Sequence, residues 1–203
     1  MSEPSTQALG DRLRAAQGAT PGPRRIEARR LGDAMRLVID RLATSRAPLD
    51  RLAEAADQLE ALAATLQDSP RRRLYDGFAE SANAGDAHAF FDWSPLLGRA
   101  NALAPPIVVE GVDGQVIGRV RFGSAYEGPP GCVHGGYIAA GFDEVLGLTN
   151  SMSGVPAMTA NLTVRYRHPT PLQQDLRYVG ILVGVSGRKV KTRGELWAGE
   201  TLT

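Results

Sequence analysis

The N-terminal half of the chain carries two apolar stripes with the spacing of amphipathic helices. Apolar residues recur every three or four positions from Ile26 to Leu42, and again from Leu49 to Leu66. The break at Ser45–Pro48 interrupts the pattern. Because the break is short, the two helices are expected to form an antiparallel helical hairpin.

The C-terminal half changes to the alternation of β-strands around one apolar helix. Ile107–Val112 and Gln115–Gly123 flank the turn signal Asp113-Gly114 and predict a β-hairpin. Gly135–Ser151 is apolar on nearly every side, which predicts a buried helix. Met158–Arg167 alternates over its whole length and predicts a long strand. Two further strands are expected over Leu176–Val185 and Lys189–Trp197.

The order of these elements predicts an α+β fold in which an antiparallel sheet wraps around one central helix. The break at Ala104–Pro106 marks a domain boundary. The expected parts are a flexible tail over residues 1–22, a helical hairpin over 23–68, a connector over 69–104 and the sheet domain over 105–203.

Composition narrows the function classes. The 203 residues carry a net charge of +1, so no global field favours nucleic acid or a membrane surface. The arginines of the first helix alternate with acids, which favours a solvated face over an anion-binding one. No segment approaches the roughly 18 apolar residues of a membrane span, and no secretory signal is recognisable. The one cysteine, Cys132, indicates a reducing compartment, and we expect a cytoplasmic protein.

The stretch that begins at His134 combines features that ordinary helices lack. Gly135 and Gly136 leave bare N–H groups at a helix start, where they favour an anion or a polarised carbonyl. Asp143 and Glu144 place two carboxylates inside an apolar run, and such groups are seldom buried unless paired or functional. Desolvation would raise the pKa of such a carboxylate toward that of a working general base.

Three motifs of the C-terminal half resemble the hotdog-fold acyl-CoA thioesterases, in the branch of the phenylacetic-acid-degradation thioesterases and the thioesterase-superfamily members. They are Gly128–Gly131, the triplet His134–Gly136 with Asp143 nine positions after its histidine, and Thr159–Tyr166. The resemblance covers about residues 105–203. It implies a hotdog fold and hydrolysis of an acyl-CoA thioester to a free acid and CoA, with neither a cofactor nor a metal.

The resemblance also implies roles for individual residues. The amide of Gly135 or Gly136 would polarise the thioester carbonyl, and His134 would help to hold it. Asp143 would act as base or nucleophile, and Thr159 would orient the attacking water. Some family members contact the substrate with an Asn shortly before the histidine, and this chain has no amide side chain there. The candidate substrate contacts are Asn161, Arg188, Lys189 and Lys191.

The length of the central helix argues for a second subunit. At 1.5 Å per residue, Asp143 lies roughly 10–14 Å along the helix from the Gly135 and Gly136 amides. One small carbonyl cannot contact both groups within one subunit. We therefore expect an obligate homodimer with two composite sites, and the sequence leaves open whether such dimers pair into a tetramer.

Each of these roles has an alternative. Asp143 could pair with an arginine such as Arg165, Glu144 could be the base, and His134 could merely cap the loop. Thr159 could be an ordinary strand residue, and the three basic residues proposed to contact CoA could be solvated charges. A Cys132 nucleophile lacks a supporting partner arrangement, and the motif of a hotdog dehydratase is absent.

The whole-chain function also has an alternative. The protein could be a non-catalytic acyl-CoA sensor or scaffold that uses the helical hairpin as its output. A retained Asp143 argues against this, since a sensor needs no base. If the protein is a thioesterase, the small residues Ala139, Ala140 and Gly141 predict space for a medium or long acyl chain.

Overall fold

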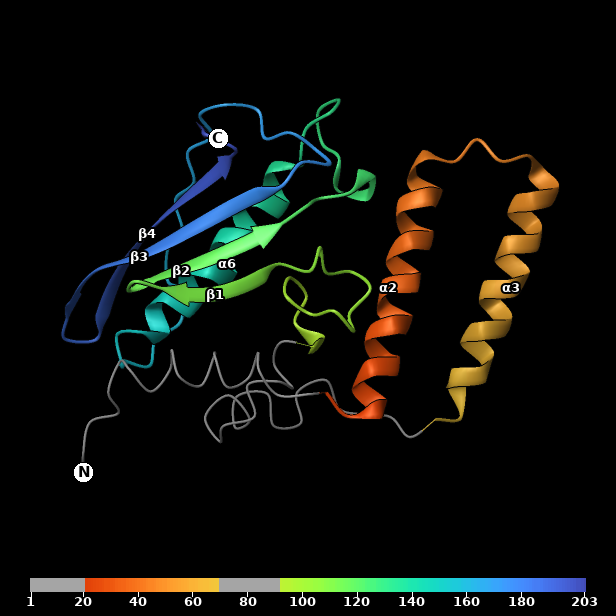
Figure 1. The fold of residues 1–203 in the computed structure, drawn as a ribbon, viewed down its shortest axis with the longest axis horizontal. Helices are drawn as coiled ribbons and strands as arrows, with labels where there is room; N and C mark the ends of the chain where they lie inside the picture. Colours follow the sequence, from red (N-terminus) through yellow and green to blue (C-terminus); the bar gives the residue numbers. More distant parts are fainter. Residues whose placement is uncertain (1–20, 70–91) are drawn as a thin grey trace.

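The computed structural model describes residues 21–69 and 92–203. Residues 1–20 of the expected tail and residues 70–91 of the expected connector lie outside the described residues. Figure 1 shows a sheet with one helix across it, and two long helices to one side. The helices are α2 (Pro23–Thr44), α3 (Leu49–Gln67) and α6 (Gly135–Ser151), with a short 3-10 helix, η1 (Ser124–Tyr126). The strands are β1 (Val108–Val112), β2 (Gln115–Val120), β3 (Leu176–Ser186), β4 (Lys189–Ala198) and β5 (Thr201–Leu202).

The five strands form one antiparallel sheet in the order β1-β2-β3-β4-β5, and α6 lies across one face of it (Figure 1). Glycines on β2, β3 and β4 let the helix approach closely. A Cβ atom at Gly180 would lie 2.1 Å from the Thr149 hydroxyl, and one at Gly194 would lie 2.8 Å from the Phe142 ring. The predicted sheet around one central helix is therefore confirmed.

The central helix is buried on one side only, which corrects the expectation of a helix covered nearly all round. The residues buried against the sheet are Ile138, Gly141, Val145 and Thr149. The opposite stripe is exposed or half-buried, and consists of Gly136, Ala140, Asp143, Gly147 and Ser151. One sheet face covers one side of a helix. The apolar composition therefore indicates a second surface that the described residues of one chain do not supply.

The strand expected over Met158–Arg167 is not part of the sheet, and this prediction is wrong for the single chain. Most of its side chains are exposed, and Met158 is 95% exposed. A groove of about 570 Å³ separates residues 161–167 from β4. Ladder hydrogen bonds need a neighbouring strand at about 4.8 Å, and none of the strands described pairs with this segment. Alternation indicated the side-chain pattern of a strand, but it cannot supply the pairing partner.

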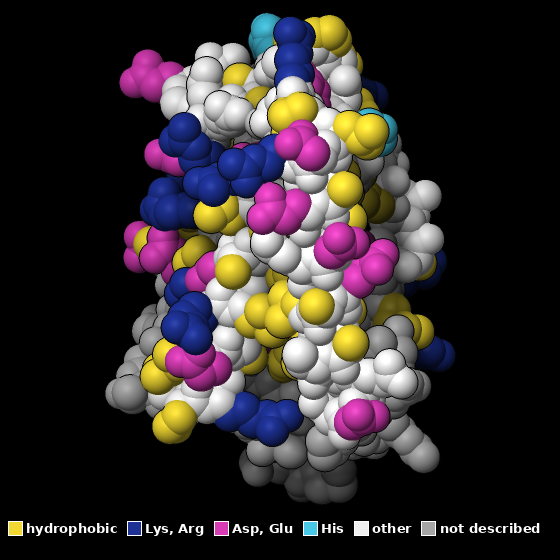
Figure 2. Space-filling view, turned by 90° about the vertical axis from the view of Figure 1, so that its right-hand side faces the viewer, with side chains coloured by type: hydrophobic (Ala, Val, Ile, Leu, Met, Phe, Trp, Pro, Cys, Tyr) yellow, Lys and Arg dark blue, Asp and Glu magenta, His cyan; other side chains and the backbone are white. Residues whose placement is uncertain are grey.

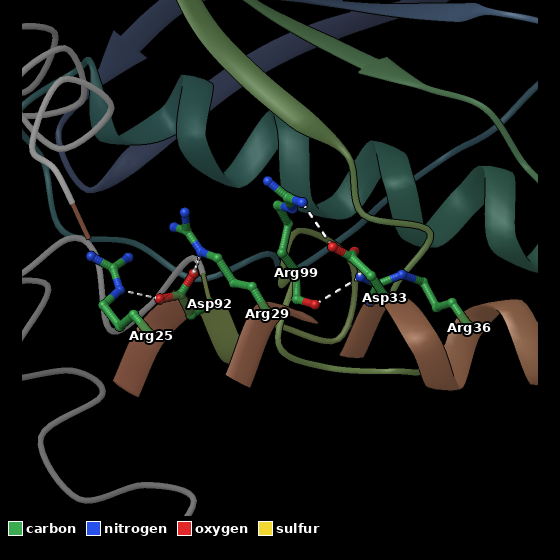
Figure 3. Close-up of polar contacts among 6 residues, drawn as sticks. All are labelled: Arg25, Arg29, Asp33, Arg36, Asp92 and Arg99. Atoms are coloured by element: carbon green, nitrogen blue, oxygen red, sulfur yellow. Dashed lines mark hydrogen bonds and ion pairs between the residues drawn. The ribbon is translucent and has the colours of Figure 1, made fainter. Parts of the chain in front are cut away.

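Arginines fasten α2 to the sheet domain. Arg25 and Arg29 both pair with the buried carboxylate of Asp92, Arg29 at 2.7 Å (Figure 3). Gly32 follows these two arginines on α2 and is buried. A Cβ atom at Gly32 would lie 2.4 Å from the Arg99 carbonyl oxygen. α2 therefore contacts the residues that precede the sheet through both charged side chains and close backbone packing.

A second cluster lies further along α2. Arg36 donates to the carbonyls of Arg99 and Asn101, each at 2.7 Å. Asp33 accepts from Arg99 at 2.8 Å and also pairs with Arg36 (Figure 3). Burial alone would raise the pKa of Asp33, but hydrogen bonds from Arg99 and Arg36 outweigh it and lower the pKa. A solvated face was expected here, and instead these arginines are structural anchors.

Candidate functional site

The loop before α6 fixes the position of His134. Gly131 has a φ of 73°, a conformation that glycine adopts without strain. Gly128 lies so close to the histidine that a Cβ atom would be 2.7 Å from the His134 Cα. The His134 N–H donates to the Tyr126 carbonyl at 2.9 Å. The Gly/Pro-rich run therefore serves to deliver the histidine to the start of the helix.

His134 caps α6 with its own side chain. Its Nδ1 atom accepts the N–H of Gly136 at 3.0 Å. Because Nδ1 is an acceptor, the proton of the neutral imidazole is on Nε2. The residue is exposed, so its Nε2–H remains a donor for a ligand. The capping role and a role in holding a carbonyl thus use different nitrogens of the same ring.

The first two amides of α6 differ in what they contact. The Gly136 N–H is taken up by His134. No acceptor in residues 21–69 or 92–203 receives the Gly135 N–H. The Gly135 carbonyl accepts the Tyr166 hydroxyl at 2.8 Å, which holds the first turn of the helix. Of the two candidate amides, the one of Gly135 is therefore better placed to donate to an oxyanion.

Asp143 lies on the exposed stripe of α6. Within the described part of the chain no lysine or arginine forms an ion pair with it, so the alternative pairing with Arg165 is not observed. The expected burial of this carboxylate is also not observed in a single copy. An acid among small residues on an uncovered stripe is open to a group from outside the chain.

Glu144, the neighbouring carboxylate, is turned into the protein. The buried Ser94 donates to its Oε1 atom at 2.6 Å, and the Ser94 hydroxyl also accepts the amides of Leu96 and Leu97. Burial raises the pKa of Glu144, the Ser94 hydrogen bond opposes the rise, and the charge of Asp143 adds to it. Glu144 therefore ties α6 to the end of the connector. Ser94 went unpredicted because a serine before a proline in a connector carries no chemical signature.

The segment after α6 runs back along the helix. A side-chain amide near the C-terminal end of α6 donates to the Ala157 carbonyl at 3.3 Å, and Tyr166 bonds to the first turn. Between these two tethers the segment passes the middle of the helix, where Asp143 lies. Asn161 lines the groove beside β4 together with Phe142 and Leu146 of α6, and both Thr159 and Asn161 are exposed.

The basic residues expected to bind CoA lie at the far end of the sheet. Arg188 is in the β3–β4 turn, and Lys189 and Lys191 begin β4. The other end of β3 faces the helix start, where the Tyr178 hydroxyl donates to a carbonyl of the first turn of α6 at 3.3 Å. One copy of the chain therefore does not bring these three cations to His134.

The described residues thus offer two candidate half-sites. The donor half-site comprises His134 and Gly135, and the acid half-site comprises Asp143, to which Thr159 and Asn161 are assigned as candidates. Eight helical steps separate Gly135 from Asp143, which corresponds to about 12 Å at 1.5 Å per residue. Because Gly135–Ser151 is one continuous helix, this separation applies within one copy of the chain.

Other kinds of site find no support in the described residues. No three His, Cys, Asp or Glu side chains of residues 21–69 and 92–203 converge as a metal site requires. None of the helices α2, α3 and α6 is long and apolar enough to cross a membrane.

Two curated relatives match part of the chain. The acyl-coenzyme A thioesterase THEM4 of Xenopus laevis is 41% identical over 70 residues, which are 34% of this chain and 32% of that protein. The acyl-coenzyme A thioesterase THEM5 of Homo sapiens is 29% identical over 100 residues, which are 49% of this chain and 40% of that protein. The chain therefore spans only about a third to two fifths of the length of these relatives.

A family model and a solved structure extend the comparison. The model described as thioesterase superfamily matches residues 130–203, which include both half-sites. A thioesterase superfamily protein of known crystal structure is 35% identical, with a TM-score of 0.75, and the similarity covers 91% of each chain. That coverage includes much of the N-terminal half as well as the sheet. The sheet around α6 is the hotdog fold, and the chain belongs to the thioesterase superfamily.

Proposed function

We propose that this chain is an acyl-CoA thioesterase, which converts an acyl-CoA and water into a free acid and CoA. The observation that carries the proposal is the presence, on one helix, of an open hydrogen-bond donor end and of a carboxylate on an exposed stripe that has no ion-pair partner in the described residues. The two curated relatives, both acyl-coenzyme A thioesterases, support the same reaction for the segment that they share with the chain.

The donor half-site is proposed to bind the thioester oxygen. Nucleophilic attack on the carbonyl carbon places negative charge on that oxygen. The Gly135 N–H lies at the N-terminus of α6, where the helix dipole favours negative charge. The His134 Nε2–H supplies a second donor. One such donor typically lowers the barrier by about 3 kcal/mol.

Asp143 is proposed to drive the attack. As a base, it takes a proton from water while the water oxygen bonds to the carbonyl carbon. The C–S bond then breaks, and the CoA thiolate leaves and is protonated. As a nucleophile, the carboxylate would instead displace the thiolate and form an anhydride, which water hydrolyses. Thr159, on the same half-site, is proposed to orient the water in either route.

The two half-sites are proposed to meet across a homodimer. About 12 Å of helix separates them within one copy, so the donor half-site of one chain would face the acid half-site of another. The uncovered stripe of α6 supports this arrangement, because it carries Asp143 among small residues that allow a second helix to approach closely. A twofold axis would generate two identical composite sites.

The substrate class is proposed to be CoA esters of medium to long acyl chains, in the cytoplasm. The small side chains of Ala139 and Ala140 are proposed to leave space for the acyl chain beside the helix start, whereas Gly141 does not contribute, since a Cβ atom there would lie 2.4 Å from the Tyr178 hydroxyl. Arg188 and the lysines that begin β4 are proposed to bind CoA phosphates of a site completed by another copy. The cytoplasmic location is proposed because a chain with a single cysteine is typical of a reducing compartment.

The test is the release of free thiol from a panel of substrates, from acetyl-CoA to palmitoyl-CoA. We expect catalytic turnover, with the highest kcat/KM at octanoyl-CoA or longer chains. The highest kcat/KM at acetyl-CoA would refute the chain-length proposal alone. Tight binding of acyl-CoA without thiol release would refute the thioesterase proposal and favour a sensor.

A further inference from the structure

The second helix of the hairpin exposes an apolar seam that nothing in the described chain covers. On α3, Leu52, Leu59 and Leu66 recur at seven-residue intervals, and Ala55 and Leu62 follow the first two of them by three positions. This is the pattern of a helix that packs lengthwise against another helix. No residue of α3 is buried, and Leu66 is 52% exposed. A packed seam would have lost most of its exposure to water.

The first helix carries a matching seam. Leu31, Met35, Val38 and Leu42 follow one another at spacings of four and three residues along α2. Leu31, Val38 and Leu42 are exposed, Leu42 at 60%. The seam differs from the stripe that fastens α2 to the sheet domain, which consists of Arg25, Arg29, Gly32 and Arg36. The helix is therefore held on one side and free on another.

The two helices carry opposite charge. Six arginines and three carboxylates give α2 a net charge of +3. Four carboxylates and one arginine give α3 a net charge of −3. Figure 2 faces the side of the molecule with the helices and shows hydrophobic side chains along the middle. Lys and Arg lie mostly to the left of that view, interspersed with acidic side chains, whereas acidic side chains outnumber basic ones over its right-hand part.

We propose that two copies of the chain interlock through their hairpins, with the acidic α3 of each copy packed against the basic α2 of the other. Seam on seam buries the exposed leucines, and the opposite charges attract. Pairing of α3 with α3 would bring two helices of charge −3 together, which charge repulsion disfavours. Because the arrangement is reciprocal, it closes with twofold symmetry into four helices. This surface is separate from the α6 stripe of the proposed active site.

Crosslinking between differently tagged copies tests the proposal. In a Cys132→Ser background, one copy carries Val38→Cys on α2 and the other carries Leu62→Cys on α3. The two full-length chains are co-expressed and treated with a short bifunctional thiol reagent. Since each chain has one thiol, a product with both tags requires α2 of one copy to lie near α3 of another. We expect that product, and its absence would overturn the proposal.

Matched substitutions on α3 separate seam contact from chance proximity. Leu59→Glu places a carboxylate in the seam, and we expect it to lower the yield of the mixed product at least about tenfold, since an unpaired charge is costly to bury. Ala64→Glu adds the same charge on the opposite face of α3 and should leave the yield unchanged. Circular dichroism monitors folding, and Leu59→Ala gives a milder loss if Leu59→Glu unfolds α3. Equal yields in all variants would overturn the proposal.

Discussion

The start and the middle of α6 offer different kinds of chemistry. At the start, groups of the same chain hold the helix end in place: the Gly136 amide donates to His134, and the Gly135 carbonyl accepts from Tyr166. In the middle, Asp143 is exposed and has no ion-pair partner in the described residues. The donor end is preorganised by its own chain, whereas the acid is not.

This difference indicates which half of the proposed site depends on a second copy. A preorganised donor binds developing charge without having to rearrange during the reaction. In the proposed dimer, the carboxylate on the uncovered stripe acquires its catalytic surroundings when another chain covers it. The account therefore separates what the fold of one chain supplies from what assembly supplies.

The largest effect is expected from Asp143→Asn. The amide keeps the shape of the side chain but can neither take a proton from water nor attack the thioester. We expect kcat to fall about 10³-fold, within the range of lost general-base catalysis. Thiol release in steady state measures it. Glu144→Gln is the matched control one position away, and a greater loss there than at Asp143 would reverse our assignment of the two acids.

A smaller loss is expected from His134→Ala. It removes the Nε2–H donor and the cap on Gly136 but leaves the Gly135 amide in place. We expect kcat/KM to fall about 10²-fold, as for loss of one oxyanion donor. His168→Ala is the control, since its Nδ1 contacts the Leu202 carbonyl at 2.9 Å, outside both half-sites. Equal activity in the two variants would remove the histidine from the mechanism.

The smallest effect concerns the buried neighbour of Asp143. Glu144→Gln retains an oxygen that accepts from Ser94, and we expect little change in kcat. Burial raises the pKa of Glu144 above its ordinary value of 4.5, so the folded protein binds its proton more tightly than the unfolded chain. The stability of the unsubstituted protein therefore falls as the pH rises from about 4.5 through the folded pKa.

Thermal unfolding across pH measures this effect. The Tm of Glu144→Gln relative to the unsubstituted protein should show no advantage near pH 4 and a growing one toward about pH 7. Tyr166→Phe, which removes the bond to the Gly135 carbonyl far from this carboxyl, should give a Tm difference independent of pH in that range. A relative gain for the unsubstituted protein at higher pH would mean that the Glu144 charge is stabilising.

The sequence was sufficient where the signal was local. The bounds of α6, the Asp113-Gly114 turn and both N-terminal helices follow from short-range pattern and are confirmed. The sequence was insufficient where the structure depends on a contact with a distant residue or with another chain. Asp143 and Glu144 are adjacent and chemically alike, and only packing shows that the second one reaches Ser94. The alternation of Met158–Arg167 likewise cannot reveal a missing neighbour.

Subunit complementation tests the composite site most directly. His134→Ala and Asp143→Asn chains, each nearly inactive alone, are co-expressed with different tags, and thiol release is measured on the mixed dimers. In a composite site, one of the two sites in each mixed dimer has both residues intact, so purified mixed dimers should recover about half of the unsubstituted activity. If each site lies within one chain, every site carries one defect, and activity no higher than that of the single variants would contradict the account.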